Sequence, residues 1–127
     1  MPALPDFETP ADLRPAVEAF YATILDDPAL GPFFANVDLA QHVEILTGFW
    51  TNVVFGEAVY RGRPFEKHLH FALPLTPAHF AVWVNRLERC VDAHASGPRA
   101  ERMKASARQI AGVFQYRLGL LDVVVEA

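Results

Sequence analysis

The stretch from Phe65 to Trp83, FEKHLHFALPLTPAHFAVW, contains the residues on which the prediction of fold and chemistry depends. Its second half has the pattern of a helix start, because Thr76 offers a capping hydroxyl and Pro77 suits the first helical position. Apolar residues then recur with helical spacing at Phe80, Trp83, Val84, Leu87 and Val91. The first half, closed by Pro74, is long enough for only one or two helical turns.

Two histidines, His68 and His70, lie in that short first half. At this spacing they do not share a helical face, so at most one of them faces inward. Phe65, Leu69 and Phe71 give His68 apolar neighbours. A lone imidazole in an apolar setting is what a haem iron needs as its proximal ligand. A surface histidine near a loop fits the residue types equally well, and both interpretations stay open on this evidence.

Helical periodicity extends over the rest of the chain. One helix is expected to start near Thr9-Pro10 or Asp12 and to end at Asp26-Asp27-Pro28, whose paired carboxylates are expected to be exposed. A second is expected between a cap at Asp38 and a stop at Gly56. The helix that starts at Thr76-Pro77 is the third, and a fourth is expected after Ser96-Gly97-Pro98. Strand-like alternation is scarce, so we predict an all-α fold of four main helices in one domain, 1–127, with an arm at 1–9 and a tail at 120–127.

The composition excludes several classes of protein. The 127 residues suit one domain, and a hydrophobic content of 52% is enough for a real core. The net charge is -4 and no basic stripe is present, so we expect no nucleic-acid partner. The single cysteine, Cys90, rules out an internal disulfide framework. We expect no membrane association and a cytoplasmic location, because neither a spanning apolar run nor a signal pattern is present.

Several polar side chains fall on the apolar faces of these helices. His42, Tyr21, Trp50 and Trp83 are all expected to point inward, where a buried polar tip needs a hydrogen-bond partner. Each is also explained as a core residue bonded to a backbone carbonyl. Near His68 there is a basic group that is either a solvated loop or a clamp for anionic propionates, formed by Arg61, Arg63 and Lys67.

The ordered set of these residues resembles the truncated haemoglobins, specifically the bacterial third group, from about Ala16 to Tyr116. The stretches that carry the resemblance are Phe20-Tyr21, Asp27-Pro28, Leu30-Gly31-Pro32-Phe33-Phe34, His42 seven residues before Phe49-Trp50, Lys67-His68-Leu69, and Pro74-Leu75-Thr76-Pro77-Ala78-His79-Phe80 before Trp83. Each stretch alone is weak evidence, whereas the whole set at these spacings is specific. The segment 35–41 is shorter than in some members of the family.

The resemblance implies a truncated globin fold, in which haem b is held between two antiparallel helix pairs. It implies His68 as the proximal iron ligand, with His70 as the only nearby rival. It implies Tyr21, His42 and Trp83 as the distal polar residues. The remaining residues that it assigns to the haem pocket are Phe34, Leu46, Phe49, Trp50 and Phe80.

This distal set predicts tight retention of O2 and binding of other diatomic ligands such as NO and CO. Slow release favours nitric oxide detoxification or redox chemistry over transport, with a reductase of unknown identity as partner. In a variant of this interpretation, His42 itself binds iron in the resting state. The alternatives are a peroxidase-like haem enzyme that uses His42 as acid and base, and a haem-free helical interaction module whose inward aromatic residues are only core.

Overall fold

The computed structural model describes residues 4–34, 37–57 and 75–120, and this part of the chain contains helices and no strand. Its elements are η1 (Pro10–Asp12), α1 (Leu13–Leu25), η2 (Gly31–Phe34), α2 (Leu39–Phe55), α4 (Pro77–His94) and α5 (Pro98–Arg117). The prediction of an all-α fold with four main helices is therefore confirmed. None of the described helices has the length and apolar character needed to cross a lipid bilayer.

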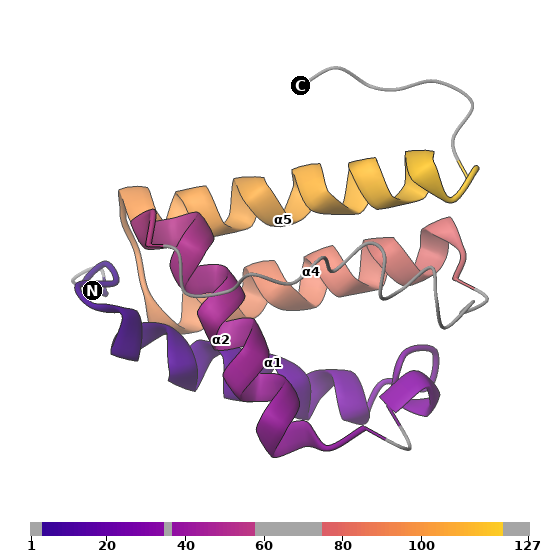
Figure 1. Cartoon of the computed structure of the whole chain (residues 1–127), viewed down its shortest axis with the longest axis horizontal. Coiled ribbons are helices and arrows are strands. Elements are labelled where there is room, and N and C mark those ends of the chain that lie inside the picture. The colour runs from indigo at the N-terminus through magenta and orange to yellow at the C-terminus, as the bar shows by residue number, and fades with distance from the viewer. Residues whose placement is uncertain (1–3, 35–36, 58–74, 121–127) are drawn as a thin grey trace.

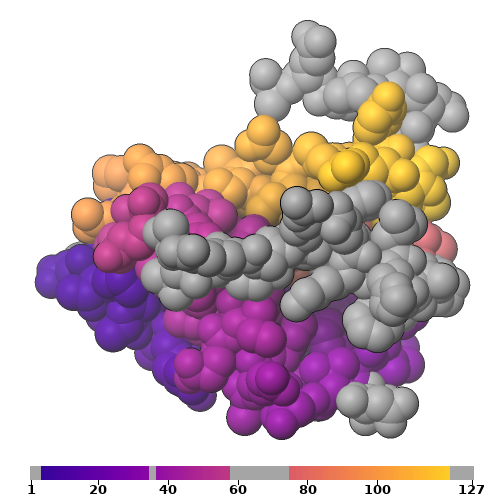
Figure 2. Space-filling view, viewed as in Figure 1, coloured from indigo at the N-terminus to yellow at the C-terminus, as the bar shows by residue number. Residues whose placement is uncertain are grey.

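The four α-helices of the described ranges form two pairs that pack on each other. α4 and α5 run side by side, α1 packs against α4, and α2 packs against both α1 and α5 (Figure 1). The space-filling view shows side chains of α2 in contact with those of α5 on the same face (Figure 2). This arrangement of one pair over another is the predicted two-over-two fold.

Local signals set the ends of these helices. The backbone N–H of Thr76 donates to Nδ1 of His79 at 2.9 Å, so the residue at the third helical position caps the start of α4. The carboxylate of Asp38 accepts from Gln41 N at 3.2 Å at the start of α2. Gly56 ends α2 with a positive φ of 71°, the left-handed conformation that favours glycine. The predicted caps at Thr76 and Asp38 and the predicted stop at Gly56 are thus confirmed.

The core lies where the inner faces of the helices meet. α1 contributes an apolar stripe to it, and the other three helices each contribute a shorter one. Burying one such side chain stabilises the fold by roughly 1.5–3 kcal/mol. Within the helices, the largest side chains with less than 2% exposure are Leu13, Val17, Phe20 and Ile24 of α1, Val54 of α2, Leu87 and Val91 of α4, and Met103 of α5.

The start of α5 is capped by a residue from the other end of the chain. Its N-cap position is Gly97, which has no side chain to offer. Instead, the carboxylate of Asp6 accepts hydrogen bonds from Arg99 N at 2.8 Å and Ala100 N at 2.9 Å. Phe7, at 2% exposure, is buried next to this contact, and its carbonyl accepts from Arg99 Nη1 at 2.9 Å. Part of the segment predicted to be an arm is therefore an integral contact of the fold.

Gly97 is the position where this contact is most sensitive to substitution. Its φ is +141°, and a Cβ atom there would lie 2.7 Å from Cβ and Cγ of Asp6. We expect Gly97→Ala to lower the free energy of unfolding by about 2 kcal/mol, from backbone strain and loss of the Asp6 cap. Urea unfolding measures this change.

The matched control is Gly112→Ala in the interior of α5, where an added Cβ has no neighbour within 4 Å. This substitution is expected to raise the free energy of unfolding by about 0.5–1 kcal/mol, because alanine is the better helix former. Equal effects of the two substitutions would contradict the proposed cap.

Candidate functional site

Three rings from three different elements meet beside the core. Tyr21 of α1 and His42 of α2 are in edge contact, with ring centroids 5.0 Å apart and an interplanar angle of 82°. Phe34 of η2 lies 5.7 Å from each of the two other centroids. The structure therefore brings together Tyr21 and His42, two of the three predicted distal residues, with Phe34, a predicted pocket residue.

Trp83 of α4 joins this cluster through Phe20. The Phe20 ring stands edge-on to Tyr21 at 5.0 Å and edge-on to Trp83 at 6.0 Å. Phe20 is buried, whereas Trp83 is half-buried. Trp83, the third predicted distal residue, is thus connected to Tyr21 through the ring of Phe20.

The Tyr21 ring is almost completely buried, with 7% of the residue exposed. This burial raises the pKa of the Tyr21 hydroxyl above its usual value near 10. The hydroxyl therefore stays protonated at neutral pH and can donate a hydrogen bond. The described rings in contact with the Tyr21 ring are those of Phe20, Phe34 and His42.

The turn that carries Phe34 is organised by Asp27. One carboxylate oxygen of Asp27 accepts from Ala29 N at 2.8 Å and Leu30 N at 3.1 Å, and its carbonyl accepts from Gly31 N at 2.8 Å. A side chain at Gly31 would meet the carbonyl oxygen of Leu25 at 2.5 Å, so glycine is needed where the turn passes the end of α1. This tight turn sends η2 back toward the ring of Tyr21.

Asp27 lies in a place that differs from the sequence prediction. We expected the Asp26-Asp27 pair to be exposed, but Asp27 is 6% exposed and only Asp26 follows the expectation. The second carboxylate oxygen of Asp27 pairs with Nη2 of Arg86 on α4 at 3.1 Å. The sequence does contain a local signal for this burial. An aspartate just after a helix commonly accepts hydrogen bonds from the backbone N–H groups of the following turn.

α2 presents two different apolar faces. Its core face, with Val43, Trp50 and Val54, is buried, and Trp50 is only 3% exposed. A second stripe at helical spacing is half-buried and consists of His42, Leu46, Phe49 and Val53. A row of large, half-exposed apolar side chains would be stabilised by burial against a flat apolar partner. The residues of this stripe therefore fit haem, with the imidazole and phenol of the ring cluster as the polar groups beside it.

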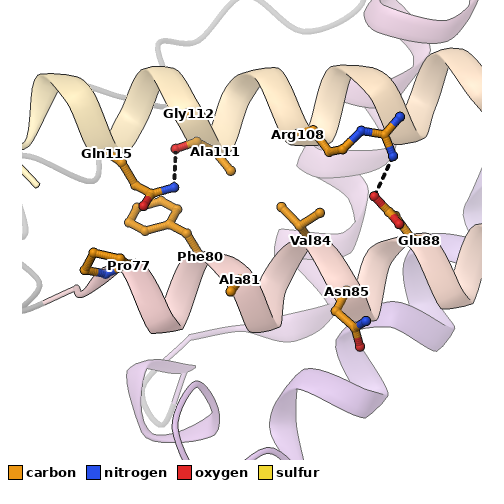
Figure 3. Close-up of a pocket in the computed structure, with 10 residues that line it drawn as sticks. All are labelled: Pro77, Phe80, Ala81, Val84, Asn85, Glu88, Arg108, Ala111, Gly112 and Gln115. Atoms are coloured by element: carbon orange, nitrogen blue, oxygen red, sulfur yellow. Dashed lines mark hydrogen bonds and ion pairs between the residues drawn. The ribbon is translucent and has the colours of Figure 1, made fainter. Parts of the chain in front are cut away.

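The predicted pocket residue Phe80 lies in a different place. It is 8% exposed and lines a groove of about 460 Å³ between α4 and α5, together with Val84 and Ala111 (Figure 3). Arg108 and Glu88 form an ion pair at 2.6 Å at the edge of this groove. All described residues that line it belong to α4 and α5, so it is separate from the ring cluster on α1, η2 and α2.

The remaining predicted site residues lie outside the described residues. They are the proximal ligand candidate His68, its rival His70, and the propionate candidates Arg61, Arg63 and Lys67. Their roles stay predictions. Within the described ranges, no group of three His, Cys, Asp or Glu side chains is placed to hold a metal ion.

Comparison with known proteins gives a family match over most of the chain. The model of the family described as bacterial-like globin matches residues 9–113. The group 3 truncated hemoglobin ctb of Campylobacter jejuni is 28% identical over 108 residues, covering 80% of this chain and 84% of the relative. The group 1 truncated hemoglobin GlbN of Nostoc is 29% identical over 98 residues, covering 77% of this chain and 80% of the relative.

Solved structures agree with these sequence matches. The crystal structure of the group III truncated hemoglobin from Campylobacter jejuni superposes with a TM-score of 0.79 at 28% identity, covering 89% of this chain and 94% of that one. The structure of Chlamydomonas reinhardtii THB1 superposes with a TM-score of 0.59 at 28% identity, covering 80% of this chain and 88% of that one. The 2/2 hemoglobin of Synechococcus, solved with covalently attached heme, shares the fold with a TM-score of 0.66 at 24% identity, covering 90% and 93%.

The carboxylate of Asp27 gives the site a testable dependence on pH. Hydrogen bonds from Ala29 N and Leu30 N lower the pKa of Asp27, and Arg86 adds to this effect. A lowered pKa stabilises the folded state above the unfolded value of about 3.9, and this stabilisation is lost as the pH falls through the folded value. Asp27→Asn is therefore expected to be less stable than the parent at pH 7 and pH 5.

Below about pH 4 the difference in unfolding free energy between parent and Asp27→Asn should narrow, because the parent carboxylate is then protonated. Urea unfolding at pH 7, 5 and 3 measures it. The control is Asp26→Asn, at the exposed neighbour, which should match the parent throughout. A difference for Asp27→Asn that is the same at pH 3 and pH 7 would contradict the assigned role of the charge.

Proposed function

We propose that this chain binds and retains dioxygen beside Tyr21 and His42. The chain belongs to the bacterial-like globins and is a haem-binding truncated haemoglobin of group III. The same pocket takes the other diatomic ligands NO and CO. In this proposal His68 supplies the proximal imidazole, Trp83 is a further distal donor, and Arg61, Arg63 and Lys67 hold the haem propionates. The observation that carries the proposal is the buried Tyr21 ring in edge contact with His42 and Phe34.

Bound haem b supplies an iron with one coordination position open to a small ligand. The chain contributes neutral donors beside that position. The Tyr21 hydroxyl stays protonated because burial raises its pKa, so it donates to a ligand that carries partial negative charge. The His42 ring, edge-on to Tyr21, is placed to keep the phenol in one orientation.

Energetics favour retention over rapid release. A hydrogen bond to a charged group contributes about 1.5–3 kcal/mol, and about 1.4 kcal/mol corresponds to a factor of ten. Two donors, Tyr21 and Trp83, would then slow the escape of a polarised ligand by roughly a hundredfold. Carbon monoxide carries less charge when bound and gains less from the same donors.

Slow release suits chemistry on the ligand better than transport. We therefore extend the proposal to oxidation of nitric oxide at the retained dioxygen, with electrons supplied by a reductase of unknown identity. A cytoplasmic location belongs to the same proposal. Cys90 is the only cysteine and is a buried free thiol, which suits a reducing compartment.

The proximal ligand is tested by substitution of each candidate histidine. His68→Ala is expected to abolish stoichiometric haem binding, because the iron loses its protein ligand. His70→Ala is expected to bind haem like the parent. Titration with haem, followed by absorption in the Soret region, measures both. Loss of binding in His70→Ala with retention in His68→Ala would reverse the assignment.

The distal donors are tested by the rate of O2 dissociation. Tyr21→Phe and Trp83→Phe each remove one hydrogen-bond donor, so each should speed O2 release by about tenfold or more, with a smaller effect on CO. Stopped-flow displacement of O2 by CO measures the rate. The control is Tyr116→Phe on α5, where the ring is 47% exposed, and this variant should match the parent. Unchanged O2 rates in both distal variants would rule out the hydrogen-bonding role.

A further inference from the structure

We infer that the Asp27–Arg86 ion pair is a positioning device for the distal pocket, which sets the rotation of α4 and thereby the place of Trp83 relative to Tyr21. The inference rests on the proposed function, because it assigns this pair to the distal donors of that site. The atoms involved are Nη2 of Arg86 and Oδ2 of Asp27, 3.1 Å apart and 59 residues apart in the chain.

The Asp27 end of the pair is rigid. Its other carboxylate oxygen accepts two backbone hydrogen bonds, from Ala29 at 2.8 Å and Leu30 at 3.1 Å. The side chain is 7% exposed, so its position is determined by the turn and not by solvent. This same turn leads into η2, where Phe34 contacts Tyr21 and His42. Asp27 is therefore a fixed point shared by α1 and η2.

The Arg86 end of the pair lies on the helix that carries Trp83. Residues three apart lie on the same side of an α-helix, so Trp83 and Arg86 both project toward α1. Trp83 contacts α1 through the edge of Phe20, with centroids 6.0 Å apart. An edge-on ring pair has a preferred geometry, but it tolerates a range of centroid distances and therefore leaves α4 some freedom to turn about its axis. A charge-assisted hydrogen bond one turn away is directional and opposes this rotation.

The positioning role can be separated from a role in folding. Arg86 is 37% exposed, and partly exposed ion pairs contribute little to the free energy of unfolding. A binding site, in contrast, needs its donors held within about 0.5 Å of the productive geometry. A small rotation of α4 would therefore disturb the ligand while leaving the fold intact.

α4 also carries a matched control. Arg108 of α5 pairs with Glu88 of α4 at 2.6 Å, with side-chain exposures of 54% and 32%. This pair also joins α4 to a neighbouring helix, but it lies at the edge of the α4/α5 groove and not at the ring cluster. Arg108→Gln removes a comparable ion pair without touching the α1 side of α4.

The experiment uses the haem-loaded, CO-bound protein labelled with 5-fluorotryptophan. The chain has two tryptophans, so the ¹⁹F spectrum has one signal for Trp83, assigned by its loss in Trp83→Phe, and one for the buried Trp50. Arg86→Gln is expected to shift or broaden the Trp83 signal and to leave the Trp50 signal in place. Arg108→Gln should move neither, and Arg86→Lys should restore part of the parent spectrum.

The rate of O2 dissociation provides the functional readout. Arg86→Gln should raise it by about threefold to tenfold, and by no more than loss of the Trp83 donor itself. In a Trp83→Phe background the same substitution should have no further effect, because the two residues act through one contact.

The outcomes separate the inference from the proposed function. A Trp83 signal that is unchanged in Arg86→Gln overturns the positioning role, and so does an additive effect in the double variant. If the signal moves but O2 dissociation is unchanged in both Arg86→Gln and Trp83→Phe, the positioning role stands and the distal-donor proposal is wrong. Equal shifts in Arg86→Gln and Arg108→Gln would show general loosening of α4 and overturn the inference.

Discussion

The edge-on contact between Tyr21 and His42 is the interaction around which the rest of the site is arranged. It joins α1 to α2 with ring centroids 5.0 Å apart. An edge-to-face pair has a preferred geometry, so it constrains the crossing of the two helices more than an aliphatic contact would. Phe34 closes the third side, which η2 can do only because the turn at Asp27 reverses the chain directly after α1. The half-buried stripe of α2 begins at His42 and continues away from this point.

The parts of the fold that could be predicted from the sequence depend on local interactions. Thr76-Pro77, Asp38 and Gly56 start or end helices through contacts within a few residues, and the structure has each as expected. The inward direction of Tyr21 and His42 follows from helical periodicity in the same way. That the two rings meet was implied only by the resemblance to truncated haemoglobins, because periodicity alone does not say which helices cross.

The parts that could not be predicted depend on contacts between distant residues. Asp6 caps α5 across more than ninety positions, and Asp27 pairs with Arg86 across 59. Each aspartate looks like an ordinary surface residue in the sequence, and its role becomes intelligible only when the partner helix is in place. Phe80 lies on the predicted inner face of α4, yet it faces α5, because α4 is covered on two sides by different helices.

In the proposed site, the distribution of charge would allow the pocket to discriminate between ligands. The described rings in contact with Tyr21 are those of Phe20, Phe34 and His42. The ion pair Asp27–Arg86 involves the residue three positions after Trp83 on α4, and its carboxylate also accepts from two N–H groups. A full positive charge inside the pocket would stabilise any anion, including hydroxide or chloride, and the bound anion would block the iron. Neutral donors instead interact weakly with an apolar ligand and strongly with one that becomes polarised on binding. In the proposed site, a charged pair outside the donors would orient them without competing for the ligand.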